Sequence, residues 1–254
     1  MRLLTLLLVP LRLAAVALVT AVLYAVMAAG QLALLGARRR RLAWSHRMAR
    51  TWFRALARIV GLRIVLHGRP PAPPFLLVAN HQSYVDIVLL GGAAGGVFVA
   101  KAEIARWPLV GHLARSVGTV FVDRTTKRDL TRAAAQVERA LADGLGVVLF
   151  PEGTTGPGPH LLPFKPPLLE VAATHDLPVH HALLRYDHPA VPWVDDTPLP
   201  RHLLALLQIP TFTAHLTFGE ESIQDSDRKR LTERLRAAME EVAAGEEPGE
   251  KQIS

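Results

Sequence analysis

A histidine and an aspartate five residues apart, His81 and Asp86, are the side chains in this chain best suited to proton transfer. They lie in the segment Asn80-His81-Gln82-Ser83-Tyr84-Val85-Asp86, directly after the apolar run Phe75–Ala79. An imidazole takes up and returns a proton near neutral pH. A neighbouring carboxylate fixes the tautomer of the ring and stabilises the imidazolium. Because α/β proteins build their sites where strands end, the segment predicts a general base assisted by a carboxylate.

An arginine ends a second apolar run. Residues 118–124 read Gly-Thr-Val-Phe-Val-Asp-Arg, so a predicted strand delivers Arg124 at its end. The planar guanidinium suits phosphate oxygens, which makes Arg124 a candidate for binding an anionic substrate. The alternative is a surface ion pair between Arg124 and Asp123 or Asp129.

A carboxylate, a glycine and two hydroxyls follow a third apolar run. Residues 147–156 read Val-Val-Leu-Phe-Pro-Glu-Gly-Thr-Thr-Gly. Gly153 lets a ligand approach the backbone, whose N–H groups can hold anionic oxygens. Glu152 could accept hydrogen bonds from a polyol or orient a basic residue, and Thr154 stands beside it. The alternative is an ordinary exit from a strand into a loop.

Metal and thiol chemistry find little support. The tandem His180 and His181 lack another histidine or carboxylate at a clear ligand spacing, so the sequence predicts no metal site. The chain has no cysteine, which excludes disulfides, thiolate metal sites and thiol catalysis.

Charge is distributed very unevenly along the 254 residues. The formal net charge is +7, yet residues 1–85 hold twelve arginines and no acidic residue, so the remainder is net acidic. This basic third suggests nucleic acid or an anionic membrane as its partner.

The sequence around the arginines decides for the membrane and against nucleic acid. Residues 13–37 carry no charge and are long enough to cross a bilayer, to lie at its interface, or to form half of a shallow hairpin broken at Pro10 and Gly30. Four arginines at 38–41 then suit anionic headgroups.

A basic amphipathic helix is predicted next, because apolar residues recur every fourth position from Trp44 to Val60 between arginines. The alternative is a helix that packs Trp52 and Leu56 on the core and leaves its arginines in water. The positive-inside rule places the catalytic body on the cytoplasmic side of the inner membrane.

Short apolar runs alternate with helical patterns over the rest of the chain. This predicts an α/β fold, a mostly parallel sheet covered by helices. The domains expected are an anchor over 1–60, an α/β domain over 61–244 and a polar tail over 245–254. Strands are expected at 63–67, Phe75–Ala79, 97–100, 119–122, 147–150, 179–184 and 214–218, and helices at 129–143, capped by Asp129, and at 226–243.

The order of these motifs resembles the glycerolipid acyltransferase family typified by 1-acylglycerol-3-phosphate acyltransferases. Residues 80–86 are similar to its Asn-His-x4-Asp block, residues 118–124 to its second block and residues 150–154 to its Phe-Pro-Glu-Gly-Thr block. Residues 98–101 with 108–111, and residues 162–165, also look like family signatures. The resemblance covers most of residues 64–218.

The resemblance implies acyl transfer from acyl-CoA or acyl-carrier protein to the hydroxyl of a lysolipid, with no cofactor. His81 would be the base and Asp86 its partner. The substrate-binding residues expected on these grounds are Asn80, Ser83, Lys101, Arg124, Glu152, Gly153, Thr154 and Lys165. The expected acceptor is 1-acylglycerol-3-phosphate.

The chain departs from the family pattern in three places, of which the first bears on the acceptor. The third block often continues Thr-Arg-Ser, but this chain has Thr154-Thr155-Gly156, as in a subgroup that acts on lyso-ornithine lipids. His181 stands where the family usually has proline, and two prolines follow Lys165. Lyso-ornithine lipid is therefore the alternative acceptor. Rival functions of other classes are a lipid esterase with Ser83 as nucleophile and a non-catalytic lipid-binding protein.

Overall fold

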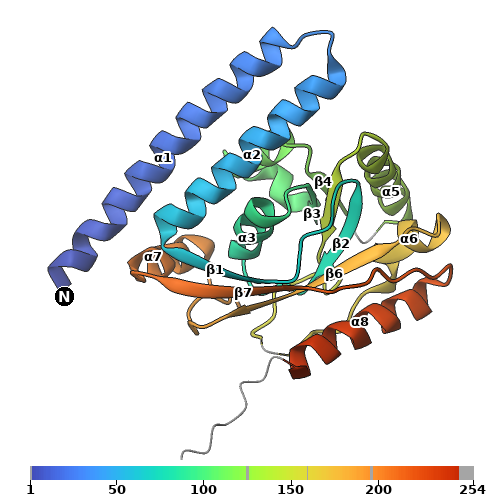
Figure 1. Cartoon of the computed structure of the whole chain (residues 1–254). Helices are drawn as coiled ribbons and strands as arrows, with labels where there is room; N and C mark the ends of the chain where they lie inside the picture. Colours follow the sequence, from blue (N-terminus) through green and yellow to red (C-terminus); the bar gives the residue numbers. More distant parts are fainter. Residues whose placement is uncertain (1, 124–125, 159, 195–196, 246–254) are drawn as a thin grey trace, which may run out of the picture.

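A mixed sheet forms the centre of the protein. The computed structural model describes residues 2–123, 126–158, 160–194 and 197–245. In these ranges the sheet has the strand order β1-β7-β6-β2-β5-β3-β4 (Figure 1). The strands are β1 (Leu62–His67), β2 (Phe75–Ala79), β3 (Val97–Lys101), β4 (Val120–Val122), β5 (Gly146–Leu149), β6 (Val179–Tyr186) and β7 (Phe212–Phe218).

Five neighbouring strands, from β6 to β4, run parallel, whereas β7 lies antiparallel to β6 and β1 pairs parallel with β7. The predicted α/β fold with a mostly parallel sheet is confirmed, and each predicted strand overlaps an observed one.

Helices cover both faces of the sheet, and β2 and β5 are buried along their whole length. One core cluster joins the sheet to α2 (Arg38–Val60), α3 (Val85–Ala93) and α7 (Leu199–Gln208) through Phe53, Leu89 and Leu206. The other joins it to α5 (Lys127–Ala142), α6 (Glu170–Thr174) and α8 (Arg228–Gly245) through Val137 and Leu235. Figure 1 shows α3 and α8 on opposite faces. The remaining short elements are α4 (Val110–Ser116) and two 3-10 turns, η1 (Ala102–Arg106) and η2 (Pro166–Leu169).

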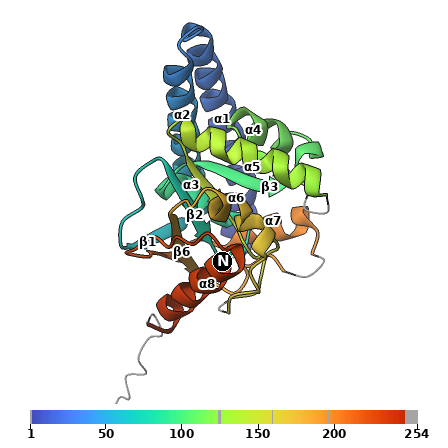
Figure 2. The same cartoon turned by 90° about the vertical axis from the view of Figure 1, so that its right-hand side faces the viewer.

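Two antiparallel helices, α1 (Arg2–Ala33) and α2, form an amino-terminal hairpin that projects from the body (Figures 1 and 2). Pro10 and Gly30, expected as breaks, lie inside α1. Gly30 serves close packing instead, since a Cβ there would come within 2.0 Å of Nε1 of Trp44 on α2. The stretch Leu7–Ala33, with mean hydropathy 2.2, is long and apolar enough to cross a membrane.

Side-chain hydrogen bonds attach α1 to the body at several points along its length. The buried guanidinium of Arg12 donates to the carbonyls of Leu207, Ile209 and Pro210, at 3.1, 2.6 and 2.6 Å, at the end of α7. Farther along, Tyr24 on α1 shares a 2.7 Å hydrogen bond with Nε2 of His112 on α4.

Large apolar side chains on the other side of α1 are exposed, among them Leu7, Leu11, Leu18, Val22 and Leu32. The outer apolar surface of the hairpin is thus on α1.

Helix α2 lies between α1 and α3, so it is the inner member of the hairpin (Figure 1). Phe53 and Leu56 are buried, and a Cβ on Gly91 of α3 would come within 2.3 Å of the Phe53 ring. The helix therefore packs much of its apolar side on the body, which was the alternative to a membrane-facing role.

The start of α5 differs from the expected one. The helix begins at Lys127, and Asp129 lies in its first turn rather than at the cap. Asp129 instead accepts a 2.5 Å hydrogen bond from the backbone N–H of Asp123 at the end of β4.

Candidate active site

The carboxyl ends of β2, β5 and β6 bring the chemically important segments together. The register pairs Val78 with Leu149 and Ala79 with Ala182, so the three strands end at one edge of the sheet. Residues 80–86 leave β2 there, and residues 150–156 leave β5 beside them. The backbone N–H of Gly156 donates to the carbonyl of His81 at 2.7 Å, which ties the two loops together.

His81 and Asp86 are in direct contact. Nδ1 of His81 lies 2.7 Å from Oδ2 of Asp86. The Asp86 side chain is fully buried, whereas the His81 side chain is 18% exposed. With Nδ1 turned to the carboxylate, Nε2 is the nitrogen left to act on a substrate. A histidine held in this way can accept a proton at Nε2 while the carboxylate stabilises the imidazolium.

Four donors hold the Asp86 carboxylate. Oδ2 accepts from His81 and from the backbone N–H groups of Gln82 and Ser83, at 2.6 and 2.9 Å. Oδ1 accepts a hydrogen bond of 2.6 Å from the hydroxyl of Tyr186, at the end of β6. Asp86 lies in the first turn of α3, where a negative charge is favourable. Tyr186 was missed in the sequence, because the contact spans 100 residues and no spacing signals it.

Aromatic packing fixes the plane of the His81 ring. Phe150, the residue after β5, stacks on it with centroids 4.0 Å apart and planes 13° apart. Phe150 in turn stacks on Phe98 of β3, which meets the edge of Phe53 on α2. The imidazole therefore has little freedom to rotate away from Asp86.

Glu152 is buried beside this pair, with 2% of its surface exposed. Burial raises the pKa of its carboxyl to about 8, against the opposing effect of hydrogen bonds from the backbone N–H groups of His81 and Leu162. The nearby charge of Asp86 also raises the pKa. The Glu152 carboxyl thus links the backbone of His81 to that of Leu162, and it is mostly protonated at neutral pH.

The amide of Asn80 continues the sheet beyond the end of β2. Its Nδ2 donates to the carbonyl of Leu184 at 3.0 Å, and its Oδ1 accepts from the N–H of Leu184 at 2.7 Å. Gln82 donates to the same carbonyl at 2.7 Å. Asn80 is 4% exposed, so its amide holds the loop rather than facing solvent.

Ser83 is fully buried, and its hydroxyl has no partner among the residues described. A nucleophile of an esterase must reach substrate, which this position does not allow. The neighbouring Tyr84 shares a 3.0 Å hydrogen bond with Nδ1 of His202 on α7. The loop is therefore held from the side of α7 as well.

Four other predicted substrate-binding residues, Lys101, Gly153, Thr154 and Lys165, lie at the same edge of the sheet. Lys101 ends β3 with its side chain exposed, as are Thr154 and Lys165. Gly153 has φ +75°, a conformation that favours glycine. Arg124 lies outside the described residues.

The tandem histidines take no part in this cluster. His181 is 6% exposed, and a Cβ on Gly219 would come within 2.1 Å of its Nε2. Burial, with a further effect from His180, lowers the pKa of His181. Within the described ranges, no three histidine, cysteine or acidic side chains group as metal ligands would.

Comparisons with known proteins agree with this arrangement. The family model described as acyltransferase matches residues 63–184. A lyso-ornithine lipid O-acyltransferase from Rhizobium meliloti is 35% identical over 236 residues, which cover 78% of this chain and 80% of the relative. The chain belongs to the acyltransferase family. A 1-acyl-sn-glycerol-3-phosphate acyltransferase from Neisseria meningitidis is 32% identical over 195 residues, covering 73% of this acyltransferase and 75% of the relative.

A solved structure has the same fold. The 1-acyl-sn-glycerophosphate acyltransferase PlsC from Thermotoga maritima superposes with a TM-score of 0.64 at 26% identity, covering 96% of this acyltransferase and 98% of that protein. The likeness therefore includes the amino-terminal hairpin as well as the α/β body.

Proposed function

We propose that this acyltransferase moves an acyl group from an acyl-CoA or acyl-carrier-protein thioester to the hydroxyl of a lysolipid, with His81 as general base. The contact of 2.7 Å between Nδ1 of His81 and Oδ2 of Asp86 carries the proposal. Nε2 would take the hydroxyl proton, and the oxygen would attack the thioester carbon directly. Glu152 and Asn80 would act by holding the loops in place.

Replacing His81 by alanine tests this mechanism. General-base catalysis contributes about 10²- to 10⁴-fold to a rate, so kcat should fall by at least about 100-fold, with the melting temperature and vesicle binding retained. Asp86→Asn should lower kcat as well. Full activity in His81→Ala would refute the role of the base.

We propose lyso-ornithine lipid as the first acceptor to test. The residues after Thr154 support this acceptor, because the arginine often found in the third block is absent. Thr155 stands in its place, and its hydroxyl donates a hydrogen bond of 2.5 Å to the carbonyl of Trp193. Similarity to relatives of that name adds support. The second candidate is 1-acylglycerol-3-phosphate, favoured by the family block that ends in Arg124 and by relatives that bear its name. Assays with both acceptors in competition would rank them by kcat/KM.

An esterase would cleave lipid without an acyl donor. Since the Ser83 hydroxyl is buried, Ser83→Ala should leave transfer within about two-fold of wild type, as a change away from the reacting atoms does. Incubation of lysolipid without donor should give no free fatty acid. Hydrolysis that depends on Ser83 would favour the esterase.

We propose further that the α1–α2 hairpin binds the cytoplasmic face of the inner membrane without crossing it. The exposed apolar side chains of α1 and the four arginines at 38–41 support attachment. The hydrogen bonds of Arg12 and Tyr24 to the body support a helix that stays in one leaflet, since a spanning segment would have to leave these partners.

A further inference from the structure

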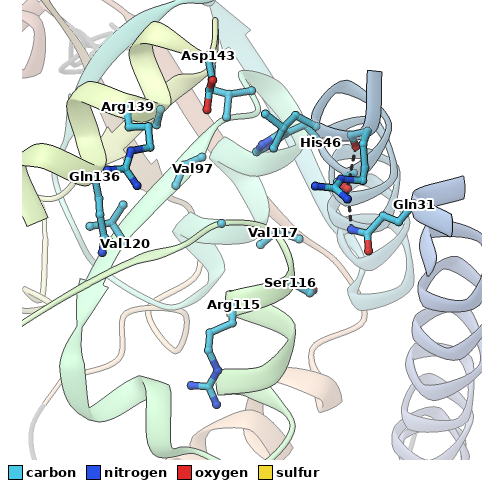
Figure 3. Close-up of a pocket in the computed structure, with 16 residues that line it drawn as sticks. Gln31, His46, Val97, Arg115, Ser116, Val117, Val120, Gln136, Arg139 and Asp143 are labelled. Carbon is cyan, nitrogen blue, oxygen red and sulfur yellow. Dashed lines mark hydrogen bonds between the residues drawn. The ribbon is translucent and has the colours of Figure 1, made fainter. Parts of the chain in front are cut away.

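A cavity of about 400 Å³ lies between the hairpin and the body (Figure 3). The hairpin contributes Gln31, Arg41 and His46 to its wall, and α5 contributes Gln136 and Arg139. The cavity reaches the starts of β3 and β4, whereas His81 follows the end of β2. Because these strands are parallel, the cavity and the candidate active site lie at opposite edges of the sheet.

Positive charge in this cavity is not balanced by the protein. Its acidic residue, Asp143, is held by both nitrogens of the Arg38 fork, at 2.5 and 2.6 Å. The guanidinium groups of Arg41 and Arg139, one on each wall, donate no side-chain hydrogen bond within the described ranges, although the charge of Arg139 helps to lower the pKa of Asp143. Arg115 also lines the cavity but donates to the carbonyl of Ala105 at 2.5 Å, and in Figure 3 it extends away from the other basic groups.

The start of α2 beside the cavity is also short of negative charge. The helix begins with four arginines, has no acidic residue in its first turn and has no side-chain cap at Ala37. The free N–H groups and the dipole make a helix N-terminus favourable for anions and unfavourable for cations. An anion bound at this end would relieve the local conflict.

A second, more open hollow adjoins the cavity and shares Gln31 and Arg41 with it. This second hollow, of about 480 Å³, is lined otherwise by Ala28, Leu32 and Leu35 of the α1–α2 turn region. Leu32 and Leu35 are 68% and 66% exposed. The two hollows thus place the exposed apolar side chains of Leu32 and Leu35 beside the arginines of the cavity, an arrangement that suits a molecule with an anionic head and a hydrocarbon chain.

We propose that these joined hollows bind one anionic phospholipid of the bilayer, which is not a substrate. Its phosphate would lie between Arg41 and Arg139, and an acyl chain would lie along Leu32 and Leu35. The lipid would join the hairpin to α5 and so seat the hairpin on the body. This inference rests on the proposed attachment of the hairpin to a membrane, because only there does a phospholipid reach both hollows.

Native mass spectrometry of the whole chain in a neutral detergent tests the site. Dioctanoyl phosphatidylglycerol is the probe and dioctanoyl phosphatidylcholine its uncharged-head counterpart. Wild type should retain the anionic probe, and the variant Arg41→Gln/Arg139→Gln should bind it about ten-fold more weakly, a loss of about 1.4 kcal/mol. Arg115→Gln is the matched control and should bind as wild type does.

Two further measurements separate the outcomes. Leu35→Glu changes an exposed side chain, so it should weaken binding without unfolding the body. Glycerol phosphate, which has the charge but no chain, should not displace the probe. Equal binding by wild type and the double variant would overturn the proposal. Displacement by glycerol phosphate would also overturn it, since the site would then hold a free phosphate.

An assay of acyl transfer to a lysolipid in the same detergent distinguishes a failure of the lipid site from a failure of the proposed function. The double variant should retain transfer, because neither arginine lies at the edge of His81. Loss of lipid binding with transfer intact in the double variant supports the lipid site independently of the proposed function. Lipid binding that persists in His81→Ala shows that the probe is not held by the candidate active site.

Discussion

Replacing Glu152 by glutamine should change how stability depends on pH, because burial raises the pKa of this carboxyl to about 8 from its ordinary value of 4.5. Between these two values the folded chain holds a proton that the unfolded chain has lost. The free energy of unfolding of wild type therefore falls as the pH rises through this window, by up to about 1.4 kcal/mol per pH unit. The window is 3.5 units wide, so the whole effect is on the order of 5 kcal/mol.

Glutamine keeps the shape of the side chain and an oxygen acceptor but does not titrate. At pH 5 both side chains are neutral in the folded chain, so the difference between wild type and Glu152→Gln at that pH contains the altered hydrogen bonding and only the first, small part of the ionisation effect. From pH 5 to pH 8 the difference should move steadily in favour of the variant. The other titratable groups are common to both proteins, so their contributions cancel in the difference.

Melting temperatures of both proteins in one detergent, measured at each pH unit, would follow the effect. For a domain of this size about 1 kcal/mol corresponds to roughly 2–4 °C, so the gap between the two curves should widen by several degrees. A gap that stays constant from pH 5 to pH 8 would refute the reasoning, because Glu152 would then be as easily ionised in the folded chain as in the unfolded one.

Two other replacements test contacts far apart in the sequence. Tyr186→Phe removes the 2.6 Å hydrogen bond to Asp86 and should lower kcat by about ten-fold with little change in KM. The free energy of unfolding should fall by about 1–3 kcal/mol. An unchanged kcat would show that Tyr186 does not position Asp86. Arg12→Met removes three hydrogen bonds from a buried guanidinium and should destabilise the body by about 2–4 kcal/mol in thermal unfolding while vesicle flotation persists. A variant as stable as wild type would mean that α1 is not docked on α7.

The order of the strands along the chain was readable because their residues are continuously apolar. The segment Phe75–Ala79 is buried on both faces and was predicted with its observed bounds. Periodicity served less well in the hairpin. The apolar residues at every fourth position from Trp44 indicated a helix correctly. Phe53 falls outside that pattern, yet its ring is the one that packs against Gly91.

The pairing of His81 with Asp86 could be predicted because the two residues are only five positions apart in the sequence. Contacts across the sheet could not be predicted in the same way. Tyr186 reaches Asp86 from β6, and Glu152 is buried against the His81 backbone only after β2 and β5 pair. Likewise, no sequence pattern shows that Arg12, within an apolar helix, meets the end of α7.

The crowding of donors around Asp86 limits where protons can go during a turnover. His81, Gln82 and Ser83 donate to its Oδ2, and Tyr186 donates to its Oδ1. The Asp86 side chain is fully buried among these donors, so it is not placed to pass a proton to water. In the proposed reaction, the proton that His81 removes from the alcohol must go to the departing sulfur, so each cycle begins and ends with the same protonation state. Such an enzyme needs no water channel to its base, which suits a site that works against a lipid surface.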